Sequence, residues 1–472
     1  MKIGIDIDNV LSNFNEILLN DYLEHDKTLN NNGIIHKGEY IRRMFDWDTS
    51  YEQNYYRNNI ERLASLLTPI KNSSRYINKL KEDGNEIYII SGRDNGEYSN
   101  PYDMTINWLK KYNIPYDKLI LTNAYKHQEK AEVCKELGID IMIDDSINVC
   151  KKCSDNNIEC ILFGTPYNKE EKRFNRINSW EEIYNYVRNK KINVILDTDT
   201  YNECDDQFAL SYLIKNQAKF NIEAITVSPY SHRPIGVSVS EGQELSYREI
   251  LKICSWLNFD VINKVFKGAT DYIQNGYSEN NDAVNKIIEI ALKNNKTYIL
   301  GIGAITNIAL AIKKEPKIID KIEIIWLGGN SFLTKDNNVE FNFRQDVQAV
   351  KEVFESKVKL TVIPCKNVAS NLTTSIYELE YFLKGKSELC DYLCQRFYND
   401  TYHGIEERRV IWDISVIAYM INRTWFKTEQ ISCPIIKEDA SYELTENRHN
   451  ITFVNYLNAN KIYSDLFEKL VK

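Results

Sequence analysis

Carboxylate side chains gather at two places in the 472-residue chain, and in both places they follow an apolar run. Asp6 and Asp8 come directly after Lys2–Ile5. The run Val194–Leu196 is followed by four acids, which are Asp197, Asp199, Asp205 and Asp206. Such runs are typical of buried parallel strands, and ligands bind at the carboxyl ends of these strands in open α/β sheets. Because crowded like charges are costly unless a cation neutralises them, the sequence predicts two divalent-metal sites and two active sites.

The first set of residues suits phosphoryl transfer. Asp6 and Asp8 lie two positions apart where a strand runs into a turn, so one can attack phosphorus while the other donates a proton to the leaving oxygen. Ser91 ends the next strand of the sheet and can donate a hydrogen bond to a phosphoryl oxygen. Asp144 and Asp145 end a later strand and can hold Mg²⁺ together with Asp6, because Mg²⁺ prefers hard oxygen ligands.

The second set suits a larger cation. Asp197 and Asp199 point to the same side of a strand, and Asp205 and Asp206 open a helix whose dipole favours negative charge. Since Ca²⁺ takes about six to eight oxygen ligands, this density of carboxylates predicts Ca²⁺.

Both sets depend on parallel strands that place them at one edge of a sheet. In the first half we expect strands at the start of the chain and at residues 85–93, 119–122, 139–145 and 160–164. In the second half a strand begins at residue 192, and others follow at 221–227, 297–303, 322–329 and 359–364. Helical patterns lie between them, which predicts an α/β fold with mostly parallel sheets. The chain is too long for one ordinary core, and a charged joint at 188–191 divides it into domains at 1–189 and 192–472.

The composition narrows the range of partners. A net charge of −8 disfavours a nucleic-acid polymer. No apolar run approaches the roughly 20 residues of a membrane span, and a strand at residue 2 leaves no room for a signal peptide, so we expect a cytoplasmic protein without membrane contact. The 10 cysteines are expected to be reduced, with the CxxC pair Cys150 and Cys153 on an ordinary helix surface.

Four motifs in the first half occur in a fixed order. They are the DxDxV stretch Asp6–Val10, the strand end Ser91-Gly92-Arg93, a lysine, and the pair Asp144-Asp145. In this order they resemble the haloacid-dehalogenase-like phosphatases, and among these the 5′(3′)-deoxyribonucleotidases and their bacterial relatives, over residues 1–188. The resemblance implies a Rossmann-like domain whose helical insert at about 13–80 is a cap over the substrate.

The same resemblance implies roles for the residues. Asp6 is the nucleophile that forms an aspartyl-phosphate, and Asp8 is the general acid and base. Mg²⁺ is bound by Asp6, by the backbone carbonyl of Asp8, and by Asp144 or Asp145. Substrate phosphate is bound at the Ser91-Gly92-Arg93 strand end, with Arg93 either a phosphate contact or a structural salt bridge.

The motif lysine has two candidates, Lys130 and, second, Lys126. His36 and His127 are expected at the surface.

Motifs in the second half also keep a fixed order. They are Leu300–Asn307, Trp326–Asn330, Glu340–Asn342 and Trp412-Asp413. Together with the acid cluster they resemble the inosine–uridine-preferring nucleoside hydrolases over residues 192–472. This implies Ca²⁺ bound by Asp199, Asp206, Asp413 and the backbone carbonyl of Ile302. Asp199 then takes a proton from the attacking water, Asp205 binds the ribose hydroxyls, and the rest of the sugar is bound by Asn330, Glu340 and Asn342.

Two departures from that family pattern concern specificity. The usual DTDPGxDD stretch is here two residues longer, over 197–206, which can alter sugar specificity. Where the family often has a histidine that protonates a purine, this chain has Trp412, which can stack on a base but cannot act as that acid. The leaving-group acid is therefore open between Arg408, His403 and Arg448, and Asp346 is expected to be structural.

These expectations combine into one function. The chain is expected to be a bifunctional enzyme that uses Mg²⁺ and Ca²⁺ to dephosphorylate nucleoside 5′-monophosphates and to hydrolyse nucleosides to base and pentose. Two alternatives stay open: a chain with only one active site, and a sensor that binds nucleotides or nucleosides without turnover. Partners are small molecules, and a homo-oligomer is allowed.

Overall fold

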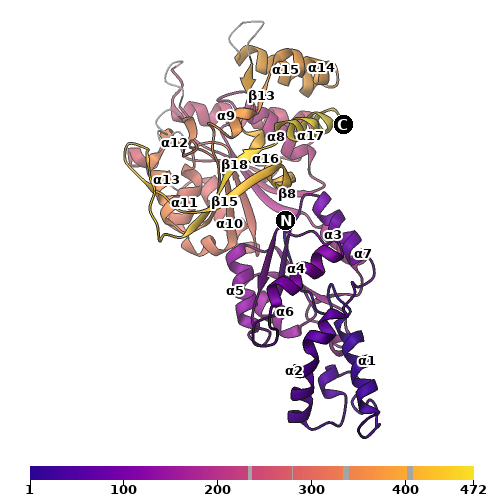
Figure 1. Ribbon diagram of the computed structural model, residues 1–472. Coiled ribbons are helices and arrows are strands. Elements are labelled where there is room, and N and C mark those ends of the chain that lie inside the picture. Colours follow the sequence, from indigo (N-terminus) through magenta and orange to yellow (C-terminus); the bar gives the residue numbers. More distant parts are fainter. Residues whose placement is uncertain (232–235, 279, 333–339, 401–407) are drawn as a thin grey trace. The chain divides into compact units, whose positions relative to one another are not determined.

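The two apolar runs become central strands of two separate sheets, one in each of the units into which the chain divides, Met1–Lys190 and Lys191–Lys472. The computed structural model describes residues 1–231, 236–278, 280–332, 340–400 and 408–472 (Figure 1). The expected α/β class with two domains is confirmed.

The N-terminal unit is built on a six-stranded sheet in the order β3-β2-β1-β4-β5-β6. All of its neighbouring strands run parallel. The strands are β1 (Lys2–Ile5), β2 (Glu86–Ser91), β3 (Lys118–Leu121), β4 (Ile141–Asp144), β5 (Glu159–Phe163) and β6 (Asn175–Ile177). Because β1 pairs with both β2 and β4, the residues that follow these three strands meet at one edge.

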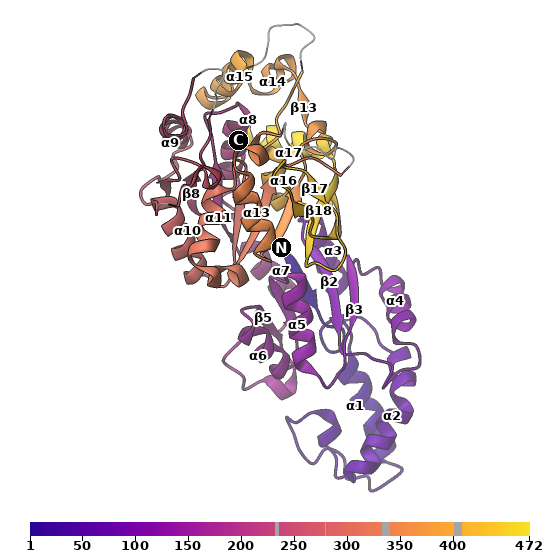
Figure 2. The same ribbon diagram turned by 90° about the vertical axis from the view of Figure 1, so that its left-hand side faces the viewer.

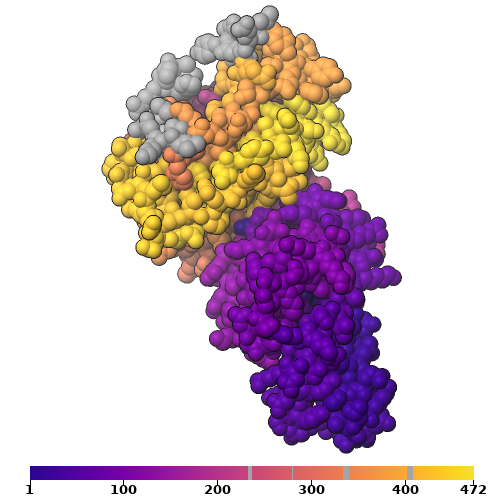
Figure 3. All heavy atoms as spheres, in the orientation of Figure 1, coloured from indigo at the N-terminus to yellow at the C-terminus, as the bar shows by residue number. Residues whose placement is uncertain are grey.

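Helices connect these strands, and two of them lie in the insert at about 13–80 that is expected to be a cap. The helices are α1 (Phe14–Asp26), α2 (Thr49–Ser65), α3 (Ser73–Glu82), α4 (Pro101–Lys111), α5 (His127–Leu137), α6 (Ile147–Asp155) and α7 (Trp180–Asn189). In both ribbon views α1 and α2 lie beyond one end of the sheet (Figure 2). They form a lobe of their own, coloured indigo, in the space-filling view (Figure 3). Tyr22 stacks on Trp47 in this lobe, with ring centroids 4.7 Å apart, which gives the insert an apolar centre.

The C-terminal unit contains an eight-stranded sheet in the order β15-β18-β12-β11-β10-β7-β8-β9. Only the edge pair β15·β18 is antiparallel among its described strands. The strands are β7 (Ile192–Thr198), β8 (Phe220–Val227), β9 (Val265–Lys267), β10 (Thr297–Gly301), β11 (Ile322–Leu327), β12 (Lys359–Ile363), β15 (Phe426–Ser432) and β18 (Asn450–Leu457). Two short ladders join β13 (Thr373–Thr374) to β14 (Arg409–Val410) and β16 (Ile435–Ile436) to β17 (Tyr442–Glu443).

Helices surround this sheet and bury its apolar faces. They are α8 (Asp205–Lys215), α9 (Val239–Trp256), α10 (Asp282–Lys293), α11 (Thr306–Lys314), α12 (Phe341–Gln345), α13 (Val347–Glu355), α14 (Ile376–Leu383), α15 (Glu388–Asp400), α16 (Ile414–Ile421) and α17 (Ala459–Val471). One core cluster joins residues of β10 and β11 to α10, α11 and α13, and Ile299 and Ile324 at its centre have no exposed surface. This packing holds the ends of β7, β10 and β11 rigidly, and the second acid cluster lies there.

Candidate active sites

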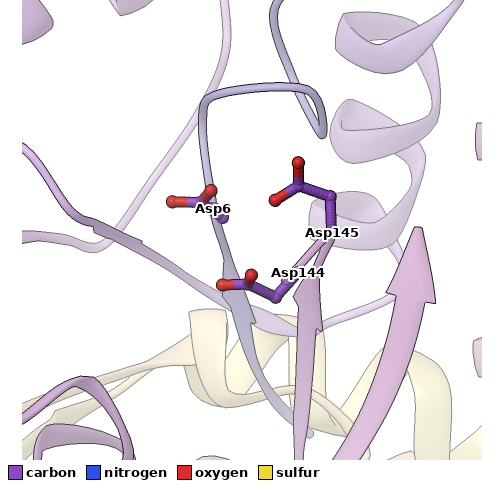
Figure 4. A group of neighbouring side chains, drawn as sticks. All are labelled: Asp6, Asp144 and Asp145. Atoms are coloured by element: carbon purple, nitrogen blue, oxygen red, sulfur yellow. The ribbon is translucent and has the colours of Figure 1, made fainter. Parts of the chain in front are cut away.

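Three carboxylates of the first set converge at the ends of adjacent strands. Asp6 follows β1, Asp144 ends β4 and Asp145 comes next, and one oxygen from each lies within 4.8 Å of the others (Figure 4). Ile5 of β1 pairs with Ile143 of β4, so the carboxyl ends of the two strands, and the aspartates there, lie side by side. All three side chains are buried.

A lysine from α5 is placed among these acids. The Nζ atom of Lys130 lies 2.9 Å from Oδ1 of Asp6 and 2.7 Å from Oδ2 of Asp144. Burial alone lowers the pKa of Lys130, but the charges of Asp144 and Asp6 outweigh it and hold the pKa above its usual value. Lys126, the second candidate, is exposed at the start of α5. The structure therefore brings Lys130 into the site.

The first acid cluster still carries excess negative charge. Burial is the main cause that raises the pKa of Asp144, opposed by the charge of Lys130. Burial and then repulsion from Asp6 raise the pKa of Asp145 to about 7. Oxygen ligands this close, with one ammonium group among them, fit a small divalent cation.

The acids open onto a cavity of about 220 Å³ that is also lined by Ser91 and Gly92. The hydroxyl oxygen of Ser91 is buried and has no hydrogen-bond partner among the described residues, as a group awaiting an anionic ligand would be. A Cβ atom on Gly92 would lie 2.9 Å from the Cα of Ala124, so the close approach of this loop requires glycine.

Asp8 also lines this cavity, but Arg93 does not. The guanidinium of Arg93 binds the carboxylate of Asp8. Its Nε donates to Oδ2 at 3.0 Å, and a terminal nitrogen donates to Oδ1 at 2.5 Å. Of the two roles expected for Arg93, the structure shows the salt bridge, and its partner is the expected general acid.

The cavity wall includes residues that the strand-end motifs did not reveal. The cap contributes Phe14, Arg42 and Tyr56. His127 also lies on the wall and is half-exposed, and His36 is exposed as expected. Asn9, a variable position of the first motif, lines the cavity too, and the further lining residues outside the motifs are Glu97, Tyr98, Asn123, Ala124, Tyr125, Ser146 and Val149.

The second cavity has a volume of about 230 Å³ and gathers the residues expected to bind the metal, the sugar and the base at the second site. These residues are Asp199, Asp205, Asp206, Ile302, Asn330, Glu340, Asn342, Trp412 and Asp413. They come from the ends of β7, β10 and β11 and from the starts of α8, α12 and α16, so the sheet edge collects them from across the unit.

Carboxylates dominate this second wall. Asp205, Asp206 and Asp413 each offer an oxygen within 4.8 Å of the others. Asp199 is buried on the same wall, and its Oδ2 has no hydrogen-bond partner among the described residues. Burial followed by repulsion from Asp206 raises the pKa of Asp199 well above its usual value, and burial followed by the charge of Asp205 does the same for Asp206 and Asp413. Lys366 is the only lysine on this wall among the described residues, and the donors fit a cation with many oxygen ligands.

The expected sugar ligands are held by the backbone. Glu340 caps α12, because its carboxylate accepts hydrogen bonds from the amides of Asn342 and Phe343 and, at 2.7 Å, from the amide of Gly329. The side chain of Asn342 donates to the carbonyl oxygens of Ile302, at 3.2 Å, and Leu327, at 3.0 Å. Both side chains are thus fixed before a ligand arrives.

The longer loop at 197–206 adds two residues to this wall. Asn202 and Glu203 line the cavity, and the Oδ1 of Asn202 is buried without a partner among the described residues. Glu203 forms an ion pair of 2.8 Å with Arg409. Burial and then the charge of Glu203 raise the pKa of Asp205 to about 7, opposed by Arg409. The extra length in the motif signalled a change here but not which side chains enter the site.

The three candidates for the leaving-group acid do not gather at the second cavity. Arg408 pairs with Glu378 at 3.4 Å and Arg448 with Glu355 at 2.7 Å, and neither lines the cavity. His403 lies outside the described residues.

Two other aspartates serve the scaffold. Asp346 caps α13 and accepts a hydrogen bond of 2.8 Å from Thr306, in agreement with the structural role expected for it. Asp197 accepts hydrogen bonds from Thr226 and Asn307 and does not line the cavity.

All ten cysteines are buried and unpaired, as expected for reduced thiols. The expected surface position of Cys150 and Cys153 is wrong, because α6 packs this face against the sheet, where both thiols join an apolar cluster with Cys134 and Cys160. Across the described residues, every helix is too short or too polar to cross a membrane.

Comparisons with known proteins divide the chain at the same region. Residues 194–464 match the family described as inosine-uridine preferring nucleoside hydrolase. Residues 1–192 match the family described as 5′ nucleotidase, deoxy (pyrimidine), cytosolic type C protein. The 5′(3′)-deoxyribonucleotidase of Bacillus subtilis (strain 168) is 29% identical over 187 residues, which are 38% of this chain and 95% of that protein.

The inosine-uridine preferring nucleoside hydrolase of Crithidia fasciculata is 26% identical over 163 residues, or 32% of this chain and 51% of that protein. Among solved structures, a plant nucleoside hydrolase aligns with a TM-score of 0.50 and 16% identity over 60% of this chain and 99% of its own. A purine-preferring ribonucleoside hydrolase from Gardnerella vaginalis aligns with a TM-score of 0.50 and 20% identity over 59% and 98%. At these identities the structural matches show the fold alone.

Proposed function

Since the chain belongs to the inosine-uridine preferring nucleoside hydrolase family through residues 194–464 and to the type C 5′-nucleotidase family through residues 1–192, we propose that it is a bifunctional hydrolase that degrades nucleotides. The N-terminal site removes phosphate from nucleoside 5′-monophosphates, and the C-terminal site splits the resulting nucleosides into base and pentose. The observation that carries this proposal is the pair of cavities, each lined by the carboxylates expected to carry out its reaction.

In the first site the side chains support an aspartyl-phosphate mechanism. Asp6 attacks phosphorus, Lys130 orients Asp6 through a contact of 2.9 Å, and the free hydroxyl of Ser91 donates a hydrogen bond to a phosphoryl oxygen. Asp8 donates a proton to the leaving oxygen and later takes one from the water that releases phosphate. Mg²⁺ held by Asp6, by the carbonyl of Asp8 and by Asp144 or Asp145 would neutralise charge on the transferring phosphoryl group.

In the second site the side chains support hydrolysis of an N-glycosidic bond. Asp199 takes a proton from the attacking water, while Asp205 holds the ribose hydroxyls and is itself oriented by the amide of Trp412 at 3.2 Å. The sugar is further bound by Asn330, Glu340 and Asn342. The anionic wall stabilises the positive charge that develops on the sugar as the base departs.

A calcium ion is assigned to this second site. The ligands proposed for it are Asp199, Asp206, Asp413 and the carbonyl of Ile302. Bound there, Ca²⁺ would lower the pKa of the attacking water.

The charges of the two cavities favour this order of reactions. Six carboxylates line the second cavity, and Lys366 is the only lysine or arginine among the described residues of its wall. The wall stays net negative even with one divalent cation bound, so a 5′-phosphate dianion is repelled. The first cavity has Arg42 and Lys130 beside five carboxylates, an excess of three negative charges against five in the second cavity, so it repels the phosphate less. We therefore propose that phosphate removal precedes base release.

Two substitutions test the proposal. Asp6→Asn should abolish release of phosphate from a panel of nucleoside monophosphates, and Asp199→Ala should abolish release of base from the nucleosides, each leaving the other reaction intact. In Asp6→Asn, base should be released from nucleosides but not from their monophosphates, as followed by chromatography. A substitution that changes no measured activity would leave the chain with one active site, and intact bound ligand without turnover would support a sensor.

The location and the assembly stay predictions. The ten free cysteines support a reducing compartment such as the cytoplasm. A homo-oligomer would be detected by light scattering of the full chain.

A further inference from the structure

Arg93 is unusual among the charged residues around the first site because it is buried, with 1% of its surface exposed, yet does not line the cavity. Its planar guanidinium meets the carboxylate of Asp8 with two hydrogen bonds, at 3.0 and 2.5 Å. The ring of Tyr98, which does line the cavity, has its centroid 5.9 Å from the guanidinium carbon. A guanidinium fixed in this way controls the direction of the carboxylate it binds.

The two oxygens of Asp8 are not equivalent in this arrangement. Oδ1 accepts hydrogen bonds from Arg93 and, at 3.3 Å, from the hydroxyl of Ser12. Oδ2 accepts only the bond from Nε of Arg93 among the described residues. Since a carboxylate oxygen has two lone pairs, Oδ2 of Asp8 keeps one that is available to a ligand.

We propose that Arg93 is the positioning residue for Asp8 and that it presents Oδ2 of Asp8 to the leaving oxygen of the phosphate ester. This inference rests on the phosphatase function proposed above. Arg93 acts through Asp8 and does not touch the phosphate, which distinguishes it from Ser91 on the cavity wall. Arg93, the third residue of the Ser-Gly-Arg strand end, thus positions the proton donor, and Ser91, the first, binds the phosphate.

The step that depends on this geometry is the first half of the reaction. A carboxylate oxygen of Asp6 forms a bond to phosphorus, and the bond from phosphorus to the ester oxygen breaks with its electron pair staying on that oxygen. The proton on Oδ2 of Asp8 moves to the same oxygen, so the alcohol leaves neutral. In the second half the oxygen of water attacks phosphorus and its proton passes to Asp8. The bond from phosphorus to the Asp6 oxygen breaks with its electron pair staying on that oxygen, which releases phosphate and restores the enzyme.

The test compares two leaving groups in the full chain. A nucleoside 5′-monophosphate has an alkoxide leaving group that needs a proton, whereas p-nitrophenyl phosphate has one that leaves without it. Arg93→Lys keeps the charge but loses the two-pronged contact. We expect kcat for the monophosphate to fall about 100-fold, as for a misplaced general acid, while kcat for p-nitrophenyl phosphate and the inhibition constant of inorganic phosphate change by less than about 3-fold.

A double-substitution cycle shows whether the effect passes through Asp8. In an Asp8→Asn background, Arg93→Lys should cause little additional loss with the monophosphate, because the group that it positions is already absent. Arg62→Lys, which alters an exposed ion pair with Asp21 in the same unit, is the matched control and should change nothing.

Three outcomes would overturn the inference. Weaker inhibition by inorganic phosphate in Arg93→Lys would make Arg93 a phosphate contact. An equal loss with both substrates, accompanied by a lower melting temperature of the N-terminal unit, would make it a structural residue. Additive losses in the cycle would separate it from Asp8. If the unaltered chain hydrolyses neither phosphate ester, the proposed phosphatase function fails instead, and nucleoside hydrolysis by the C-terminal unit verifies that the chain is folded.

Discussion

Replacing Lys130 with methionine is the most direct perturbation of the first site, because this lysine is the cation in direct contact with its acids. Its ammonium group lies 2.9 Å from Asp6 and 2.7 Å from Asp144, and only 5% of the residue is exposed. Methionine keeps the length and apolar stem of the side chain. The substitution therefore removes the charge and leaves two buried carboxylates without their partner.

The size of the effect follows from this burial. Removing one member of a buried ion pair costs about 3–5 kcal/mol, and solvent screening reduces this little at so buried a position. In a unit of this size each kcal/mol corresponds to about 2–4 °C in melting temperature, so we expect a fall of about 6–20 °C in the transition of the N-terminal unit. Phosphatase activity should be lost, because Asp6 loses the group that orients it.

The cost should also depend on pH. The pKa of Lys130 is raised, so its contribution is fully present throughout the range below its unfolded pKa of about 10. Any pH dependence of the variant therefore comes from the acids. The pKa of Asp144 is raised by burial, and protonation of this group at low pH removes the charge that Lys130 compensates. The destabilisation by Lys130→Met should be larger at pH 8 than at pH 5.5.

Calorimetry of the full chain without divalent cations measures the effect, and hydrogen exchange read by mass spectrometry assigns it to residues 1–190. Lys126→Met, at the exposed start of the same helix, is the matched control and should resemble the unaltered chain. Hydrolysis of nucleosides by the C-terminal unit reports the amount of folded enzyme. Two results would refute the reasoning. One is an unchanged melting temperature of the N-terminal unit in Lys130→Met at pH 8, and the other is loss of phosphatase activity in Lys126→Met but not in Lys130→Met.

Three further predictions concern both sites. Gly303→Ala should lower nucleoside hydrolysis about 10- to 100-fold and spare phosphatase activity, because the added Cβ atom would lie 2.7 Å from Oδ1 of Asp199 and displace that carboxylate. Parallel assays of the two reactions check this, and unchanged nucleoside hydrolysis would contradict it. Mg²⁺ should raise the melting temperature of the N-terminal unit more at pH 8 than at pH 6. Burial and then repulsion from Asp6 raise the pKa of Asp145 to about 7, so at pH 6 the ion competes with a proton for this carboxylate. Equal shifts of the melting temperature at the two pH values in calorimetry would count against a metal site there. Trp412→Ala should raise the KM for nucleosides about 10-fold and Trp412→Phe much less, because stacking on a base contributes about 1–3 kcal/mol. Steady-state kinetics measure both values, and an unchanged KM in Trp412→Ala would mean that this ring on the cavity wall does not stack on the base.

Residues at strand ends could be located from sequence because the sheet fixes where they meet. Asp6, Ser91 and Asp144 end or follow β1, β2 and β4, and these strands are neighbours in a parallel sheet, so their carboxyl ends share one edge. Each is preceded by an apolar run that has no other stable location than the interior. The same logic places Asp199 and Ile302 together at the ends of β7 and β10.

Residues outside those edges could not be placed in this way. Arg42 and Tyr56 reach the first cavity from the cap, whose position over the sheet depends on tertiary packing and not on a local pattern. The partner of Arg93 was undetermined because a strand-end arginine can face either the cavity or the carboxylate behind it. Strand β15 was missed because it is an edge strand whose exposed positions are polar, and its alternation is therefore weak.

The two acid clusters solve the same electrostatic problem in different ways. In the first, Lys130 supplies a permanent positive charge between Asp6 and Asp144, so part of the geometry is held by the protein itself. In the second, the acid group consists of Asp205, Asp206 and Asp413. Arg409 is paired with Glu203 of the longer loop and is not part of this group. Arg409 offsets part of the negative charge on Asp205, and the rest of the repulsion within that group is relieved by protonation or by a bound cation, but protonation would remove the carboxylate ligands that the ion requires. Ion binding is thus a condition for the active form of the second site, whereas in the first site it completes an arrangement that Lys130 already holds.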